Sequence, residues 1–357
     1  MPRSALTSPV HDHTPIFESF RGAYATQLLT AAVAEFDLFR VVSETSPTIQ
    51  DLHRSVGLER RPAVVLTTAL RAMGLLACDS DGRLSLTPMA AEHLLPGGEF
   101  DVSGYVSLAA DDPAVREMIE RLRTNRPANA EAEEGAAFIY RDGMESAMER
   151  ESTARFFTMA LAGRAKNVAP HLARVAPLAD VRRLLDIGGG TGIYSIACLQ
   201  RHPSLEACVL DRPEVLKVAH EMAMEYGVGN RIALIAGDMF SDPLPNNCQA
   251  ILLSNVLHDW DEPACEALVR RCADALPPGG MLLIHDVFLN DELDGPLPIA
   301  LYSAALFTLT EGRAYSQAEY VRWLDKAGLN VGEMLPTLIH CGLLVARKPV
   351  WKSVTFS

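Results

Sequence analysis

The chain has 357 residues, of which 48% are hydrophobic and 22% charged, so its length and composition predict a large buried core divided between two domains. Its formal net charge of −13 disfavours binding to nucleic acid, which requires basic side chains opposite the phosphates, and favours a small-molecule partner. The seven cysteines include no Cys-x-x-Cys pair, which argues against a disulfide framework or a zinc site. No apolar stretch approaches about 18 residues and the first residues are polar, so we expect a soluble, cytoplasmic protein without a membrane span or a signal peptide.

The first hundred residues predict a flexible tail followed by a small helical domain. Residues 1–20 are polar and show no clear periodicity. Helical apolar spacing then runs from Tyr24 to Phe39, a capped short helix follows at 48–52, and Pro62 opens a longer helix. After Gly74 the pattern alternates on both sides of a turn, which predicts a β-hairpin. Three helices and a hairpin across residues 21–100 are typical of a winged-helix module.

A winged helix often reads DNA, so a winged-helix regulator is one function to weigh. Residues 21–100 contain seven basic and nine acidic side chains, and Arg60-Arg61 is the one basic pair among them. A DNA-binding module has the opposite balance of charge. Because the first helix is strongly apolar, we expect it to be buried against another subunit instead.

The rest of the chain predicts a helical linker and then an α/β domain. Residues 101–175 are helical but less regular, with an exposed connection near 125–135. From 176 to 357 strands alternate with helices, which predicts a Rossmann-like parallel sheet. Strands are expected near 183–187, 206–210, 232–236, 249–256 and 281–286, and helices near 192–201, 213–226, 262–275 and 316–327. Two final extended runs, 329–335 and 339–346, lie too close together for a crossover helix, so they should form an antiparallel edge.

A glycine loop follows the first of these strands, in the run Asp186-Ile-Gly-Gly-Gly-Thr-Gly. Such a loop brings backbone N–H groups against a ligand at the carboxyl edge of a parallel sheet. The spacing is Gly-x-Gly-x-Gly, and the third glycine of a dinucleotide fingerprint is missing, since Ile193 or Ser195 occupies its place. The loop therefore favours a nucleoside without a diphosphate and argues against a nicotinamide oxidoreductase. Gly188 and Gly190 are its expected binding positions.

Acidic residues end the next two strands of the predicted sheet. Asp211 is placed to accept hydrogen bonds from two ribose hydroxyls, and Asp238 can accept one from an exocyclic adenine N–H. Met239 and Phe240 can pack on the faces of the ring. Either aspartate alone could simply cap the helix that follows it. Together with the glycine loop, on three consecutive strand ends, they predict a nucleoside site.

These motifs, with Asn255-Val-Leu-His-Asp-Trp260 after them, resemble the class I S-adenosylmethionine-dependent methyltransferases. Within that class they are most similar to the small-molecule O-methyltransferases that include plant caffeic acid and animal acetylserotonin O-methyltransferases. The resemblance implies S-adenosylmethionine as methyl donor, S-adenosylhomocysteine as product, no metal, a small-molecule acceptor and a homodimer formed through residues 21–100. It also places Ser254 at the cofactor, where plant members carry a lysine.

The resemblance further implies which side chains line the acceptor: Phe157, Leu161, Arg164 and Phe307. Leu161 stands where plant members carry methionine, and Arg164 where they carry histidine. The identity of the acceptor therefore does not transfer from the plant enzymes.

His258 is the expected catalytic base. An acceptor hydroxyl with a pKa near 8 to 10 is a poor nucleophile at neutral pH, and a histidine with a pKa of about 6.5 is the usual group that removes its proton. His258 follows an apolar strand at the carboxyl edge, and Asp286 ends the next strand, where it can accept the second imidazole N–H. His285 should point to the opposite face, and Asp261 should cap the next helix.

Ala314 departs from the family pattern, because plant members carry a second acid there. The departure leaves open methylation of nitrogen or carbon, or non-methyl chemistry in a protein that still binds the cofactor. Metal-dependent transfer is disfavoured, since residues 307–312 offer His258 and Asp259 no obvious third ligand.

Overall fold

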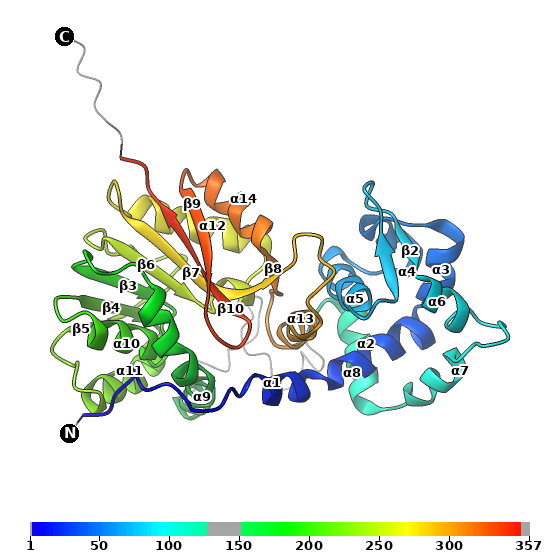
Figure 1. The fold of residues 1–357 in the computed structure, drawn as a ribbon, viewed down its shortest axis with the longest axis horizontal. Helices are drawn as coiled ribbons and strands as arrows, with labels where there is room; N and C mark the ends of the chain where they lie inside the picture. The colour runs from blue at the N-terminus through cyan, green and yellow to red at the C-terminus, as the bar shows by residue number, and fades with distance from the viewer. Residues whose placement is uncertain (1, 127–150, 351–357) are drawn as a thin grey trace, which may run out of the picture. The chain divides into compact units, whose positions relative to one another are not determined.

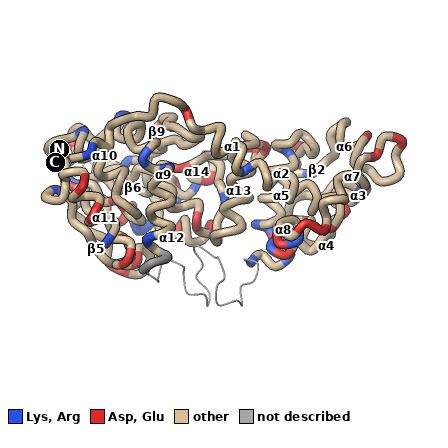
Figure 2. Tube along the Cα trace, turned by 90° about the horizontal axis from the view of Figure 1, so that it is seen from below, with Lys and Arg blue, Asp and Glu red and all other residues tan. Residues whose placement is uncertain are grey.

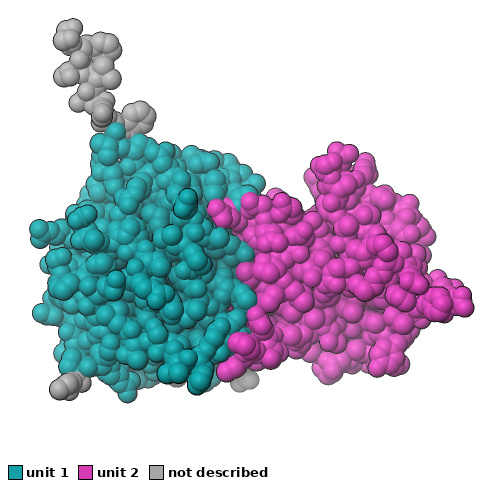
Figure 3. Space-filling view, viewed as in Figure 1, with its two compact units in different colours: residues 1–14, 145–288, 318–357 teal, residues 15–144, 289–317 magenta. Residues whose placement is uncertain are grey.

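The computed structural model describes residues 2–126 and 151–350. The chain divides into two units, coloured separately in Figure 3. Unit 1 contains residues 1–14, 145–288 and 318–357, and unit 2 contains residues 15–144 and 289–317. None of the helices in the described ranges is long and apolar enough to cross a membrane.

Unit 1 is built on a mixed sheet in the order β5-β4-β3-β6-β7-β10-β9 (Figure 1). The first five of these strands pair in parallel, and β10 pairs antiparallel with both β7 and β9. The predicted fold class, a Rossmann-like sheet with an antiparallel C-terminal edge, is confirmed. The strands are β3 (Arg183–Ile187), β4 (Glu206–Asp211), β5 (Ile232–Ala236), β6 (Ala250–Ser254), β7 (Met281–Leu289), β9 (Asn330–Pro336) and β10 (Cys341–Arg347).

The central strands form because their side chains are apolar on both faces. Every residue of β6 and β7 is buried, as expected for parallel strands covered by helices on each side. Helix α9 packs on α10 and α11, and Lys326 of α14 contacts Glu266 of α12 at 2.6 Å. The helices of this unit are α9 (Glu151–Val175), α10 (Ile193–Arg201), α11 (Pro213–Glu225), η5 (Leu257–Asp259), α12 (Glu262–Ala275) and α14 (Gln317–Lys326).

Unit 2 is helical and carries one small hairpin. The antiparallel pair β1 (Leu76–Cys78) and β2 (Leu84–Leu86) follows the helices, as predicted for a winged helix. Helix α8 (Pro113–Thr124) carries both basic and acidic positions (Figure 2). Its Arg116 pairs with Asp111, just before the helix, and its Arg121 pairs with Glu117. The remaining elements are α1 (Thr14–Arg21), α2 (Ala23–Thr30), η1 (Ala31–Glu35), α3 (Leu38–Thr45), η2 (Ile49–Asp51), α4 (Leu52–Val56), α5 (Arg60–Ala72), α6 (Pro88–His93), α7 (Ser103–Val106), η3 (Ser107–Ala109), α8 (Pro113–Thr124), α13 (Leu297–Leu309) and β8 (Tyr315–Ser316).

Helix α13 belongs to unit 2, although it follows the strands of unit 1 in sequence. It packs on α5 and α2, and Ala304 and Phe307 join the same buried cluster as Leu28 and Leu66. The sequence predicts a single catalytic domain over residues 176–357. The structure differs, because it assigns α13 to unit 2. The physical reason is that α13 is apolar on all sides and is stable only when helices cover it.

The N-terminal segment also differs from the predicted tail of residues 1–20. Residues 14–21 form α1, and the residues before them are bonded to unit 1. The Arg3 N–H donates to the Glu225 carbonyl at 3.2 Å, and the Ala5 N–H donates to Gln200 Oε1 at 2.7 Å. These backbone bonds order a polar segment that has no hydrophobic periodicity of its own.

Candidate active site

The glycine loop joins β3 to α10 and lies against the segment that leads to His258. Gly188 has a positive φ of 64°, and a Cβ there would lie 3.0 Å from Val256 Cγ2. A Cβ on Gly189 would lie 2.8 Å from both Asp186 Cγ and Val209 Cγ1. The loop therefore needs glycine in order to sit this close to its neighbours.

Replacing Gly189 with alanine should destabilise unit 1. The added methyl group overlaps two buried side chains, and overpacking of this kind costs about 1–3 kcal/mol of unfolding free energy. Gly163→Ala is the matched control, because a Cβ there meets no atom within 4 Å and alanine favours the helix. Urea denaturation measures both variants. Equal stability of Gly189→Ala and the unmodified protein would contradict this packing.

Asp186, which opens the loop, is a buried carboxyl group. Ser195 Oγ donates to its Oδ2 at 2.7 Å, whereas no described group bonds Oδ1. Burial raises the pKa of Asp186 to about 7, the Ser195 hydrogen bond lowers it, and the charge of Asp211 raises it further. A buried acceptor without a partner beside a glycine loop suits a ligand that brings a donor or a positive charge.

Asp211 reaches the glycine loop from the end of β4. Its Oδ2 accepts from the Gly190 N–H at 2.8 Å, and its Oδ1 accepts from the Arg212 N–H at 2.7 Å. Burial raises the pKa of Asp211, and the two backbone hydrogen bonds oppose that rise. The structure thus brings Gly190 and Asp211 together, as the sequence predicts.

The segment after β5 lies at the adjacent strand end, because Asp211 pairs with Ala236. Asp238 Oδ1 accepts from the N–H groups of Phe240 at 2.6 Å and Ser241 at 3.2 Å. It therefore closes a turn at residues 238–241, whereas the structural alternative considered for this residue was a helix cap. The Phe240 ring packs edge-to-face on Trp260 at 4.8 Å. The Met239 carbonyl accepts from Arg271 Nε at 3.0 Å.

His258 and Asp286 form a buried pair at the carboxyl edge of the sheet. Because Ser254 of β6 lies opposite His285 of β7, the chain leaving β6 passes beside Asp286. His258 Nδ1 lies 2.5 Å from Asp286 Oδ1, and the two residues are 3% and 1% exposed. Burial lowers the pKa of His258, but the charges of Asp286 and Asp259 outweigh burial, so the pKa is raised overall. The predicted base and its orienting acid are in hydrogen-bonding contact.

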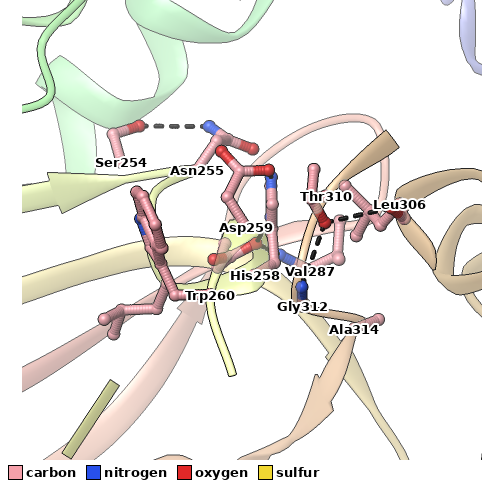
Figure 4. Close-up of polar contacts among 12 residues, drawn as sticks. Ser254, Asn255, His258, Asp259, Trp260, Val287, Leu306, Thr310, Gly312 and Ala314 are labelled. Carbon is pink, nitrogen blue, oxygen red and sulfur yellow. Dashed lines mark hydrogen bonds and ion pairs between the residues drawn. The ribbon is translucent and has the colours of Figure 1, made fainter. Parts of the chain in front are cut away.

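Two further side chains contact this pair, and the sequence analysis assigned neither of them a role in it. Tyr320 of α14 donates from its hydroxyl to Asp286 Oδ2 at 3.0 Å. Asp259 Oδ1 lies 3.6 Å from His258 Nε2, and Figure 4 shows the two side chains together. Burial raises the pKa of Asp259 to about 7, and His258 opposes that rise. Asp261 is the helix cap that the sequence predicts, since it accepts from the Ala264 N–H at 3.0 Å.

His285 has different neighbours from Asp286, as expected for adjacent residues of a strand. Its Nδ1 lies 2.8 Å from Ser254 Oγ, and its Nε2 lies 3.0 Å from Thr337 Oγ1. Burial lowers the pKa of His285 to about 3, and the charge of Arg164 lowers it further, so the ring is neutral. The Ser254 hydroxyl also accepts from Asn255 Nδ2 at 3.2 Å (Figure 4).

The residues expected at the acceptor fall into two groups. Phe157, Leu161 and Arg164 lie on α9 of unit 1, where Arg164 Nη1 donates to Asn255 Oδ1 at 2.9 Å. Phe307 lies in the buried core of unit 2, with the guanidinium of Arg61 4.7 Å from its ring centroid. The structure therefore brings Arg164 beside the segment that carries His258, and it assigns Phe307 to a different unit. Among the described side chains, no cluster of three His, Cys, Asp or Glu residues could hold a metal.

Comparison with known families agrees with this geometry. A family model for an O-methyltransferase domain matches residues 128–330, more than half of the chain. The chain belongs to the O-methyltransferase family. The resemblance seen in the sequence is confirmed, and with it the enzyme class, the methyltransferases of EC 2.1.1.

Several known proteins are similar to this chain over most of their length. The 3-hydroxy-5-methyl-1-naphthoate 3-O-methyltransferase of Streptomyces sahachiroi is 36% identical over 86% of each chain. The L-tyrosine C(3)-methyltransferase of Streptomyces lavendulae is 31% identical over 87% of this chain and 84% of that protein. A crystal structure of an O-methyltransferase family 2 protein from Planctomyces limnophilus, in complex with apigenin, has a TM-score of 0.89 and 45% identity over 97% of this chain and 99% of that chain.

Proposed function

We propose that this protein transfers a methyl group from S-adenosylmethionine to a hydroxyl of an aromatic or polyketide-like small molecule, with His258 as the general base. The observation that carries the proposal is the buried contact between His258 and Asp286. A histidine held by a buried carboxylate at the carboxyl edge of a nucleotide-binding sheet is suited to removing a proton from an acceptor.

The described residues fit the methyl donor. The glycine loop presents backbone at Gly188 and Gly190, the buried Asp186 oxygen has no partner, and Asp211 lies against the loop. We assign the ribose to Asp211, and the adenine to Asp238, Met239 and Phe240. Ser254 is the weakest member of this set, because its hydroxyl is already bonded to His285. When bound, the donor supplies a sulfonium methyl group whose leaving group is a neutral thioether.

The protein's own contribution is to orient the acceptor and move a proton. Asp286 accepts the hydrogen bond from His258 Nδ1, so Nε2 is the nitrogen that takes the acceptor's proton. The acceptor oxygen then forms the new bond to the methyl carbon, and the electron pair of the broken carbon–sulfur bond stays on sulfur. Asp259, 3.6 Å from Nε2, stabilises the imidazolium that results.

Phe157, Leu161 and Arg164 are the proposed acceptor contacts on α9. Leu161 lies one turn before Arg164 on α9 and is 54% exposed, and an exposed apolar side chain suits contact with an aromatic ring. One relative is named for a hydroxynaphthoate, and another was solved in complex with apigenin. Both support an aromatic hydroxyl compound as the acceptor. The charge of Arg164 also favours an acceptor that becomes anionic as it loses its proton.

The experiment is a mass-shift screen with methyl-deuterated S-adenosylmethionine against phenols, naphthols, flavones, amines and keto acids. Transfer to a phenolic oxygen supports the proposal, and NMR of the product distinguishes it from methylation of the ring carbon. Carbon methylation is the second candidate, because the L-tyrosine C(3)-methyltransferase is 31% identical. Exclusive carbon or nitrogen methylation would overturn the hydroxyl assignment.

We also propose a homodimer formed through residues 21–100. Unit 2 exposes large apolar side chains near this module, including Phe20, Phe100, Tyr105 and Leu108. The chain of 38.8 kDa should sediment at twice that mass at micromolar concentration. Amide exchange in residues 21–100 should rise on dilution to the monomer. A monomer at micromolar concentration, or protection confined to other residues, would contradict this interface.

A further inference from the structure

Tyr320 is fully buried at the far side of the His258–Asp286 pair. Its ring packs edge-to-face on Phe288 at 5.0 Å and on Trp323 at 5.2 Å, and its relative exposure is 0%. These two contacts fix the ring, and so they fix the direction of the hydroxyl, which lies 3.0 Å from Asp286 Oδ2. Packing alone does not require a hydroxyl here, because phenylalanine would fill the same space.

The Asp286 carboxylate is held on both of its oxygens. Oδ1 receives His258 Nδ1 at 2.5 Å and the Val287 N–H at 2.8 Å, and Oδ2 receives the Tyr320 hydroxyl. A buried carboxylate oxygen left without a donor is costly, and the carboxylate could then rotate to recover a partner. The Tyr320 hydroxyl therefore restricts Asp286 to the rotamer in which Oδ1 faces the base.

We propose that Tyr320 is a positioning residue of the methyl transfer, which acts through Asp286 to orient His258 and to limit its affinity for a proton. This inference rests on the proposed role of His258 as base. It gives a functional role to Tyr320, which is 34 residues from Asp286 in sequence and touches no reacting atom.

The expected pH effect follows from the charges around the base. His258 faces Asp286 from β7, Asp259 from its own turn, and Arg164 from α9, whose charge opposes protonation. His285, on the same strand as Asp286, is neutral. A hydroxyl that donates to Asp286 withdraws negative charge from the carboxylate. Removing that hydroxyl therefore leaves the pair with a higher affinity for a proton.

The test is Tyr320→Phe, which removes one oxygen and keeps the ring. We expect the turnover number to fall about tenfold, the size of one lost hydrogen bond to a charged group, with the affinity for S-adenosylhomocysteine unchanged. The acid limb of the kcat/KM profile should move to higher pH, by about half a unit. The shift in pH distinguishes positioning of the base from a general loss of structure.

Two comparisons make the outcome decisive. Tyr226→Phe removes a tyrosine hydroxyl from the same unit, at the end of α11 beside Gln200, so it should leave the turnover number and the acid limb unchanged. In an Asp286→Asn background, Tyr320→Phe should cost less than twofold, because the charge it stabilises is gone. An unshifted acid limb, or the same loss in both backgrounds, would overturn the positioning role. If His258→Ala loses activity but Tyr320→Phe is unaffected, the role proposed for Tyr320 is wrong. If His258→Ala keeps full activity, the proposed function is wrong as well.

Discussion

Replacing His258 with alanine should lower the turnover number by about 10²–10⁴ and leave the affinity for S-adenosylhomocysteine nearly unchanged. The reason is that in the proposed mechanism His258 removes the acceptor's proton, whereas other residues are proposed to hold the donor. Steady-state kinetics and calorimetry measure the two quantities. His220→Ala is a matched control, because His220 is exposed on α11 and should leave turnover intact.

The pH dependence of this variant distinguishes a base from a structural histidine. In the unmodified enzyme His258 must be neutral to accept a proton, and its pKa lies above the ordinary value of 6.5. Activity should therefore fall as the pH drops through that raised pKa. In His258→Ala, raising the pH above the acceptor's own pKa should restore turnover, since the acceptor then arrives ionised. A loss that persists up to about pH 10 with an ordinary phenol would rule out His258 as the base.

Replacing Asp211 with alanine should weaken binding of S-adenosylhomocysteine by about tenfold to a hundredfold, as expected for the loss of two hydrogen bonds to ribose hydroxyls. The change also removes the acceptor for the Gly190 N–H, so the loop loses support at the same time. Isothermal titration calorimetry gives the dissociation constant. An unchanged constant would mean that the ribose lies elsewhere.

Two controls separate these contributions for Asp211. Asp180→Ala removes an exposed aspartate of the same unit and should leave binding unchanged. Asp211→Asn keeps an acceptor oxygen for the Gly190 N–H but removes the charge. If the loop contact dominates, Asp211→Asn should bind almost as well as the unmodified protein; if the ribose contacts dominate, it should remain weakened.

Most strands of unit 1 could be predicted because their signals are local. The apolar residues Leu184, Leu185 and Ile187 follow a polar segment, and the structure assigns β3 to Arg183–Ile187. The antiparallel edge could be predicted from the length of one connection, since only a short turn separates β9 from β10. By contrast, α13 escaped prediction, because a helix that is apolar on every side has no periodic pattern.

The candidate site divides in the same way. His258 follows β6, and Asp286 lies in the neighbouring strand β7, one residue past the last residue that pairs with β6. Their contact was therefore predictable from the order of the motifs. Tyr320 has no such signal. It belongs to the buried stripe of α14, where an aromatic residue is ordinary core, and only the packing of that helix brings its hydroxyl to Asp286.

The sequence by itself determined the family, the Rossmann-like sheet and the pairing of His258 with Asp286. Each depends on spacing along the chain, which the regular geometry of strands and turns converts directly into position. Only the tertiary structure decided that α13 joins unit 2, that residues 2–14 bond to unit 1, and that Tyr320 supports the base. These contacts arise between segments far apart in sequence, and they depend on how buried surfaces fit together, which no local pattern of residues encodes.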